Sequence, residues 1–78
     1  MKTIEEHDLV VLERYIEELG LIRGDIGTVV GIYSDQNGFE VEFQTNGDKT
    51  IGVLTLESKD IRPFSGNAIL HVRELEMK

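Results

Sequence analysis

Residues 39–44 constrain the fold of this chain more than any other segment, because apolar and polar side chains alternate along them without interruption. The segment reads Phe39, Glu40, Val41, Glu42, Phe43 and Gln44. A period of two is typical of an antiparallel β-strand with one face in the core and the other in solvent. We therefore expect a half-buried strand here that directs Glu40 and Glu42 to solvent.

Turn signals on both sides of this strand predict its neighbours. Asp35 to Gly38 and Thr45 to Asp48 each contain an Asn-Gly pair, whose residues accept the positive φ angles of tight hairpins. The flanking runs, Ile26 to Tyr33 and Lys49 to Leu56, are rich in Val, Ile and Thr. Two hairpins in succession predict a meander of three strands.

A further run, Lys59 to Phe64, closes the series of strands. Ile61 and Phe64 are available for the core. Pro63 suits a sheet edge or the end of a strand, where a missing N–H does least harm.

The segment before the meander supports two interpretations. Residues 3–19 have the capping-box spacing and apolar intervals of one helix, with Gly20 placed as its stop. The compact apolar run Leu9 to Leu12 instead favours a strand, and three strands alone shield the faces of a small sheet poorly. We expect a strand from about Asp8 to Glu13, followed by a helical turn at Tyr15 to Leu19, with the single helix as the alternative.

The chain beyond Phe64 forms a C-terminal extension, residues 65–78. It begins with a break at Ser65 to Asn67 and then carries Ile69, Leu70 and Val72, which suit a short helix or a last strand. These side chains are too apolar for a solvated tail, so we expect them to pack on the barrel or on a second molecule. The expected organisation is a domain over residues 1–64 and this extension, in a monomer or a homodimer.

Length and cysteine content exclude several classes of protein. A chain of 78 residues buries only about 60% of the surface that its unfolded form exposes, which leaves room for one core. The absence of cysteine excludes disulfides, thiolate metal sites and a cysteine nucleophile. The longest apolar run has four residues against the roughly 20 that span a bilayer, and no secretory leader pattern begins the sequence. We expect a cytoplasmic location.

The charge balance bears on the partner. Asp and Glu number 15 against 8 Lys and Arg, which gives a formal charge of −7. Because nucleic-acid affinity depends mostly on neutralising phosphates with Lys and Arg, this balance disfavours nucleic acid and fits a basic protein partner better. A role in solubility alone is the simpler alternative.

Three segments together resemble a known family. They are Leu-Ile-Arg-Gly-Asp-Ile-Gly-Thr-Val-Val at 21–30, Phe-Glu-Val-Glu-Phe at 39–43 and Thr-Ile-Gly-Val-Leu-Thr-Leu at 50–56. With the leading run Asp8 to Leu12, they resemble the bacterial domain of unknown function family 4926 over roughly residues 7 to 64. The resemblance implies a mainly β fold, a five-stranded SH3-like barrel with a helical turn in its first loop. It implies no activity.

The glycines of the first of these segments have a structural explanation. Gly24 and Gly27 stand where the chain leaves a long first loop and enters a strand, a corner that favours positive φ or close backbone approach. Neither phosphate-binding glycine pattern occurs in the sequence.

Residues for catalysis do not form a recognisable set. His7 and His71 lack the spacing of metal ligands. Ser34, Ser58 and Ser65 have no histidine nearby in sequence, so no triad is visible, and a barrel of this size has little volume for a cleft that would tune a carboxylate. We therefore expect that the protein is not an enzyme and that it has no catalytic residue, metal site or cofactor.

Five residues are the candidates for partner binding. Tyr15, Glu17 and Tyr33 are expected to line a groove between the first loop and the hairpins, and Glu40 and Glu42 to form an acidic strand face. Pairing of an exposed edge strand with a partner strand is the other route. Sequence alone leaves groove and edge strand open.

The resulting hypothesis is a non-enzymatic protein-binding module, for example an acidic neutraliser of a basic partner in the manner of an antitoxin or immunity protein. One alternative is an accessory or assembly subunit of a larger enzyme. Another is a nucleic-acid-binding barrel of the KOW type, which would need Arg23, Lys49, Lys59 and Arg62 to converge on one face.

Overall fold

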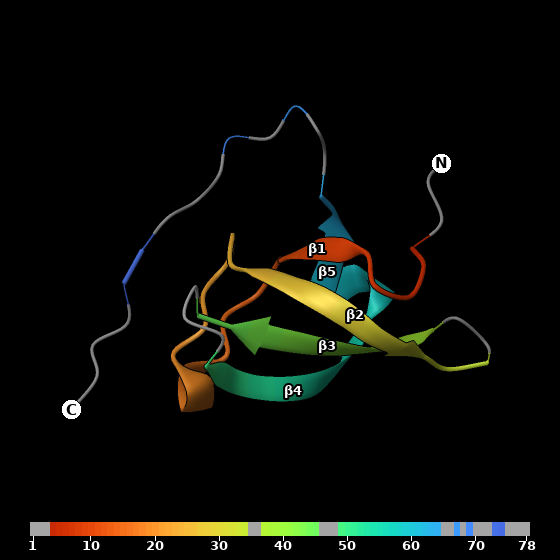
Figure 1. Ribbon diagram of the computed structural model, residues 1–78, viewed down its shortest axis with the longest axis horizontal. Coiled ribbons are helices and arrows are strands. Elements are labelled where there is room, and N and C mark those ends of the chain that lie inside the picture. Colours follow the sequence, from red (N-terminus) through yellow and green to blue (C-terminus); the bar gives the residue numbers. More distant parts are fainter. Residues whose placement is uncertain are drawn as a thin grey trace.

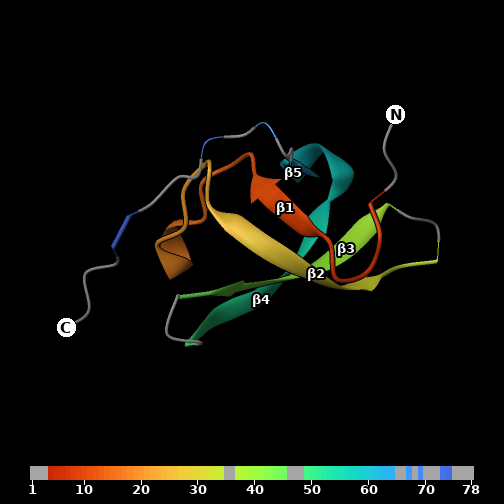
Figure 2. The same cartoon turned by 45° about the horizontal axis from the view of Figure 1, so that its top comes forward.

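The sheet of this protein contains five antiparallel strands in the order β4-β3-β2-β1-β5. A computed structural model of the chain describes residues 4–34, 37–45, 49–64, 67, 69, 73 and 74. The elements are β1 (Leu9–Leu12), η1 (Glu17–Leu19), β2 (Ile26–Ile32), β3 (Gly38–Gln44), β4 (Thr50–Glu57), η2 (Ser58–Asp60) and β5 (Ile61–Pro63), where η is a 3₁₀ turn. The sheet is strongly twisted, with β1 and β5 on one side of β2 and with β3 and β4 on the other (Figures 1 and 2). The expected mainly β class is confirmed, and the arrangement is compatible with an SH3-like barrel.

The predicted meander is present as β2, β3 and β4. Val41 in the middle of β3 lies opposite Val29 of β2 and Leu54 of β4, so the three strands are in register through the core. Phe39, Val41 and Phe43 are buried, as the alternation predicts. Residues 35–36 and 46–48 of the two predicted turns lie outside the described residues.

The first segment is a strand followed by a helical turn, and the single-helix alternative is wrong. β1 pairs with both β2 and β5, which places Val10 and Leu12 at the centre of the core, each fully buried. Those two sets of sheet hydrogen bonds outweigh the helical spacing of the apolar residues. η1 ends at Gly20, whose φ of 71° is left-handed.

The last strand is shorter than the sequence suggests. The predicted run from Lys59 becomes a 3₁₀ turn up to Asp60, and only Ile61–Pro63 pair with β1. A reciprocal capping box turns the chain, because the side chains of Glu57 and Asp60 each accept a hydrogen bond from the other's backbone N–H. Pro63 stands at the strand end, as expected.

Gly24 and Gly27 are required for two different reasons, a positive φ at the first and close packing at the second. Gly24 adopts a φ of 97°, which a side chain disfavours. A Cβ atom on Gly27 would lie 2.6 Å from Cγ1 of Val41 and 2.9 Å from Cε1 of Phe43, so these two core side chains pack directly on the Gly27 backbone and leave no space for a side chain there.

The extension is described only in part. Ile69 is 95% exposed, so its side chain does not pack on the sheet. Leu70 and Val72 lie outside the described residues. The prediction of a helix or a strand for this segment falls on these residues and stays a prediction. No helix in the described part of the chain is long and apolar enough to cross a bilayer.

Candidate functional site

Two carboxylates lie side by side on the outer face of β3. Glu40 and Glu42 alternate with the buried Phe39, Val41 and Phe43, so both project away from the core. Residues two apart on one strand are separated by about 7 Å, which leaves room for a separate cation at each carboxylate. We use the name acidic outer face for these two carboxylates together with Tyr33 and Val53, which flank them.

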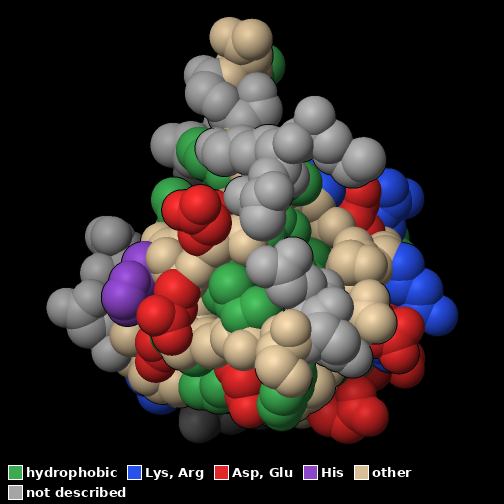
Figure 3. Space-filling view, turned by 90° about the vertical axis from the view of Figure 1, so that its right-hand side faces the viewer, with side chains coloured by type: hydrophobic (Ala, Val, Ile, Leu, Met, Phe, Trp, Pro, Cys, Tyr) green, Lys and Arg blue, Asp and Glu red, His purple; other side chains and the backbone are tan. Residues whose placement is uncertain are grey.

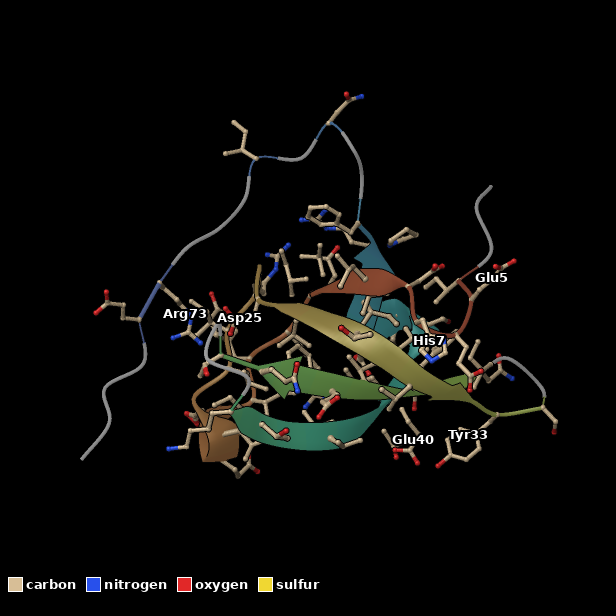
Figure 4. The ribbon with its side chains drawn as sticks, viewed as in Figure 1. Glu5, His7, Asp25, Tyr33, Glu40 and Arg73 are labelled. Atoms are coloured by element: carbon tan, nitrogen blue, oxygen red, sulfur yellow. The ribbon has the colours of Figure 1, made fainter. Side chains whose placement is uncertain are left out.

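Tyr33 joins this face at the end of β2. Its hydroxyl donates a hydrogen bond to Oε1 of Glu40 at 3.1 Å, and the two side chains lie together at one end of the sheet (Figure 4). A Cβ atom on Gly38 would lie 2.5 Å from Cδ2 of Tyr33, so the ring packs directly on the Gly38 backbone. A shift of register in β2 between Val29 and Gly31 precedes this contact.

Glu42 occupies the centre of the same face. Its Oε2 accepts hydrogen bonds from Oγ1 of Thr50 at 2.9 Å and from Nε2 of Gln44 at 3.4 Å. Val53 of β4 lies opposite Glu42 and is 50% exposed. An exposed aliphatic side chain and an exposed tyrosine therefore flank the two carboxylates.

Most of the described Lys and Arg side chains form ion pairs with carboxylates other than Glu40 and Glu42. The pairs are Arg14 with Asp60, Arg23 and Arg62 with Glu13, Lys59 with Glu57, and Arg73 with Asp25. Among the described residues, Glu40 and Glu42 contact no cation and accept hydrogen bonds from neutral groups only. Seen from the right-hand side of Figure 1, acidic side chains are interspersed with exposed hydrophobic ones, and Lys and Arg gather at one margin beside further acidic groups (Figure 3). Negative charge on the acidic outer face is thus uncompensated within the described structure.

Tyr15 and Glu17 lie elsewhere, in the segment that leads into and forms η1. The structure does not bring Tyr33 to them: η1 is at the left of Figure 1, and Tyr33 is at the right of Figure 4, which has the same view. Tyr15 is 63% exposed. The five residues expected from the sequence therefore divide into two groups.

A shallow groove lies between this first-loop segment and β4. Its volume is about 400 Å³, and it is lined by Arg14, Ile16, Glu18, Leu19, Leu54, Thr55 and Leu56. A Cβ atom on Gly52 of β4 would lie 2.9 Å from Cδ1 of Leu19, so the Leu19 side chain packs directly on the Gly52 backbone. This contact attaches the first loop to β4. A groove at the first loop was expected, but Tyr15, Glu17 and Tyr33 are not among the residues that line it. On the loop side, its lining consists of the sequence neighbours of Tyr15 and Glu17. Both inward-facing and outward-facing residues of β4 line it, which places it along the free edge of that strand.

The ion pair between Arg73 and Asp25 was not predicted from the sequence. Nε of Arg73 donates a hydrogen bond to Oδ1 of Asp25 at 2.8 Å, and Nη2 donates to Oδ2 at 2.6 Å. The hydrogen bond to Asp25 raises the pKa of Arg73 above its ordinary value; burial of the guanidinium acts in the opposite direction, and the charge of Asp25 adds to the increase. The partners are 48 positions apart, so no local spacing could have indicated the pair.

His7 has an unusual backbone conformation for a residue other than glycine. Its φ of 74° is left-handed, and its N–H donates to the carbonyl of Val29, which fixes the turn before β1. His7 is exposed and lies near Glu5 (Figure 4). No group of three or more His, Asp or Glu side chains among the described residues is arranged to hold a metal ion.

A family model of a domain of unknown function, DUF4926, matches residues 6–63. The chain belongs to the DUF4926 family. This confirms the resemblance seen in the sequence, and the match runs from the turn before β1 to the end of β5. It includes the acidic outer face and Asp25, whereas Arg73 lies outside it. No curated protein matches this DUF4926 chain. No solved structure matches it either.

Proposed function

We propose that this DUF4926 protein is a non-enzymatic binding module whose acidic outer face docks a basic segment of a protein partner. The observation that carries the proposal is the uncompensated pair Glu40 and Glu42 on one strand face, in a molecule whose described cations mostly lie against other carboxylates. A lysine or arginine of a partner supplies the missing counter-charge.

The surroundings of the two carboxylates suit a protein ligand. Tyr33 is 47% exposed and Val53 is 50% exposed, so they offer apolar contact area beside the charges. Tyrosine is enriched in protein interfaces, where its ring is buried and its hydroxyl keeps a hydrogen bond. The charges accelerate association and select against acidic partners.

A neutraliser of a basic protein, in the manner of an antitoxin or immunity protein, is one concrete form of this module. An accessory subunit of a larger enzyme would use the same face, so the identity of the captured partner separates the two. A cytoplasmic location and a monomeric or dimeric state stay predictions.

The nucleic-acid alternative has less support. Arg23 and Arg62 do converge, but they converge on the carboxylate of Glu13, at 3.4 Å and 3.2 Å. Lys59 lies 3.6 Å from Glu57. A phosphate would have to compete with these carboxylates, which weakens the electrostatic attraction that such binding needs.

Capture from a native lysate tests the proposal. The tagged protein, the double variant E40K/E42K and the control E74K are each incubated with untreated and with nuclease-treated lysate, and bound proteins are identified by mass spectrometry. Glu74 is exposed and lies in the C-terminal extension, so E74K changes the charge without touching β3. Both substituted positions of the double variant project away from the core, so we expect it to fold.

The expected result is a basic protein that the wild type and E74K retain and that E40K/E42K loses. Retention by E40K/E42K would contradict a docking role for this face. A partner that disappears on nuclease treatment would favour the nucleic-acid alternative, which the steep salt dependence of phosphate contacts would then have to support.

A further inference from the structure

The loop between η1 and β2 contains a site for a guanidinium group. Asp25 accepts two hydrogen bonds from Arg73, one on each carboxylate oxygen, and the carbonyl oxygen of Gly20 accepts a third from Nη2 at 2.6 Å. The Asp25 side chain is 11% exposed and that of Arg73 is 27% exposed. We use the name arginine site for the Asp25 carboxylate together with the Gly20 carbonyl.

Hydrogen bonds that do not involve Arg73 attach the arginine site to the sheet. The N–H of Leu12 donates to the carbonyl of Asp25, and the N–H of Gly24 donates to the carbonyl of Leu12, so the loop is tied to a fully buried residue of β1. Oδ2 of Asp25 also accepts a hydrogen bond from the N–H of Ile22 at 2.8 Å, which orients the carboxylate. We therefore expect the site to keep its shape when its occupant leaves.

The occupant comes from a different part of the chain than the site. Gly20 and Asp25 lie within the family match over residues 6–63, and Arg73 lies in the extension beyond it. Ile69, another described residue of the extension, is 95% exposed and makes no apolar anchor. The contact of Arg73 is therefore a polar attachment of the extension to a preformed site on the domain.

We propose that the arginine site is a recognition site for an arginine side chain of a protein partner, and that Arg73 is a tethered occupant which competes with that ligand. The site lies at the opposite end of the molecule from Tyr33 and Glu40 (Figure 4), so it is separate from the acidic outer face. The two sites are tested by different substitutions.

The geometry selects arginine over lysine. Two parallel N–H groups of one guanidinium meet the two oxygens of Asp25, while a third N–H reaches the Gly20 carbonyl. This bidentate arrangement fits the planar fork of arginine, whereas a lysine ammonium is a compact point charge that cannot reproduce it.

The tether makes Arg73 a moderate competitor. Eight residues, 65–72, join Phe64 to Arg73. Because Arg73 belongs to the same chain as the site, a free ligand has to compete with an intramolecular one. A partner that presents arginine with further contacts displaces Arg73, and removal of Arg73 opens the site to weaker ligands.

The test uses the full-length protein, isotope-labelled for NMR, in wild-type and R73A forms. The probe is Nα-acetyl-arginine methylamide, and the matched control is the corresponding lysine compound. The reporter is the amide signal of Ile22, because its N–H donates to the Asp25 carboxylate. The variant R73A/D25N removes the charge of the site while its side-chain oxygen remains available to Ile22.

In R73A, the arginine probe should shift the Ile22 signal saturably, and the wild type should need a several-fold higher probe concentration. The lysine compound should not produce this shift, and R73A/D25N should lose it. E40K/E42K, with Arg73 also replaced by alanine, should bind the probe like R73A, so failure of the acidic outer face leaves this result unchanged. Absence of a saturable shift in R73A, or equal shifts from arginine and lysine, would overturn the proposal.

Discussion

Gly27 shows how one position makes room for core side chains of the neighbouring strand. Because a Cβ atom there would lie 2.6 Å from Cγ1 of Val41, we expect G27A to lower the free energy of unfolding by about 1–3 kcal/mol. Gly31 provides the matched control, since its Cβ would lie 3.4 Å from the flexible side chain of Glu40. Urea unfolding measures both variants. Equal stability of G27A and G31A would contradict the packing of Val41 and Phe43 on the Gly27 backbone.

Arg73 carries a prediction about pH. The hydrogen bonds to Asp25 raise the pKa of Arg73. Its stabilising contribution is therefore fully present below the unfolded pKa, which is itself strongly alkaline, and is lost only as pH rises through the still higher folded pKa. We expect R73A to lower the free energy of unfolding by about 1 kcal/mol, a modest value because the pair is partly exposed. The loss should be the same at about pH 7 and about pH 10. A loss that shrinks across this interval in urea unfolding would contradict this assignment.

At the scale of elements, β1 joins the two halves of the sheet. It pairs with β2 on one side and β5 on the other, and Leu12 at its end is fully buried. We expect L12A to cost about 2–5 kcal/mol, the usual range for emptying a core leucine site. Leu9 on the same strand is 47% exposed, so L9A should cost much less. Thermal or urea unfolding compares the two, and similar losses would show that β1 is not placed as described.

The elements that could be predicted are those specified by short-range patterns. The alternation at 39–44 and its flanking turn signals determine the meander, because period and turn chemistry act over a few residues. The start of β5 could not be predicted, since the reciprocal capping of Glu57 and Asp60 draws the preceding residues into η2. The local pattern of residues 3–19 is compatible with both a strand and a helix, and the pairing of β1 with β2 and β5 decides between them.

At the scale of the whole molecule, the candidate sites were predictable to different degrees. The acidic face follows from alternation alone, so Glu40 and Glu42 were identified correctly as outward-facing neighbours. The contact of Tyr33 with Glu40 depends on the register shift in β2, which no local pattern indicates. The pairing of Arg73 with Asp25 joins residues from a loop and the extension, and only the folded chain brings them together.

The charge distribution of the whole molecule supports our proposal that the acidic outer face binds a basic protein segment. The most direct measurement is an NMR titration of the labelled protein with a lysine- and arginine-rich peptide, and separately with an oligonucleotide, at low salt. We predict that the peptide shifts the amide signals of Glu40, Glu42 and Val53, that E40K/E42K abolishes these shifts, and that the oligonucleotide causes none. Peptide shifts confined to other surfaces, or shifts with the oligonucleotide alone, would contradict the account.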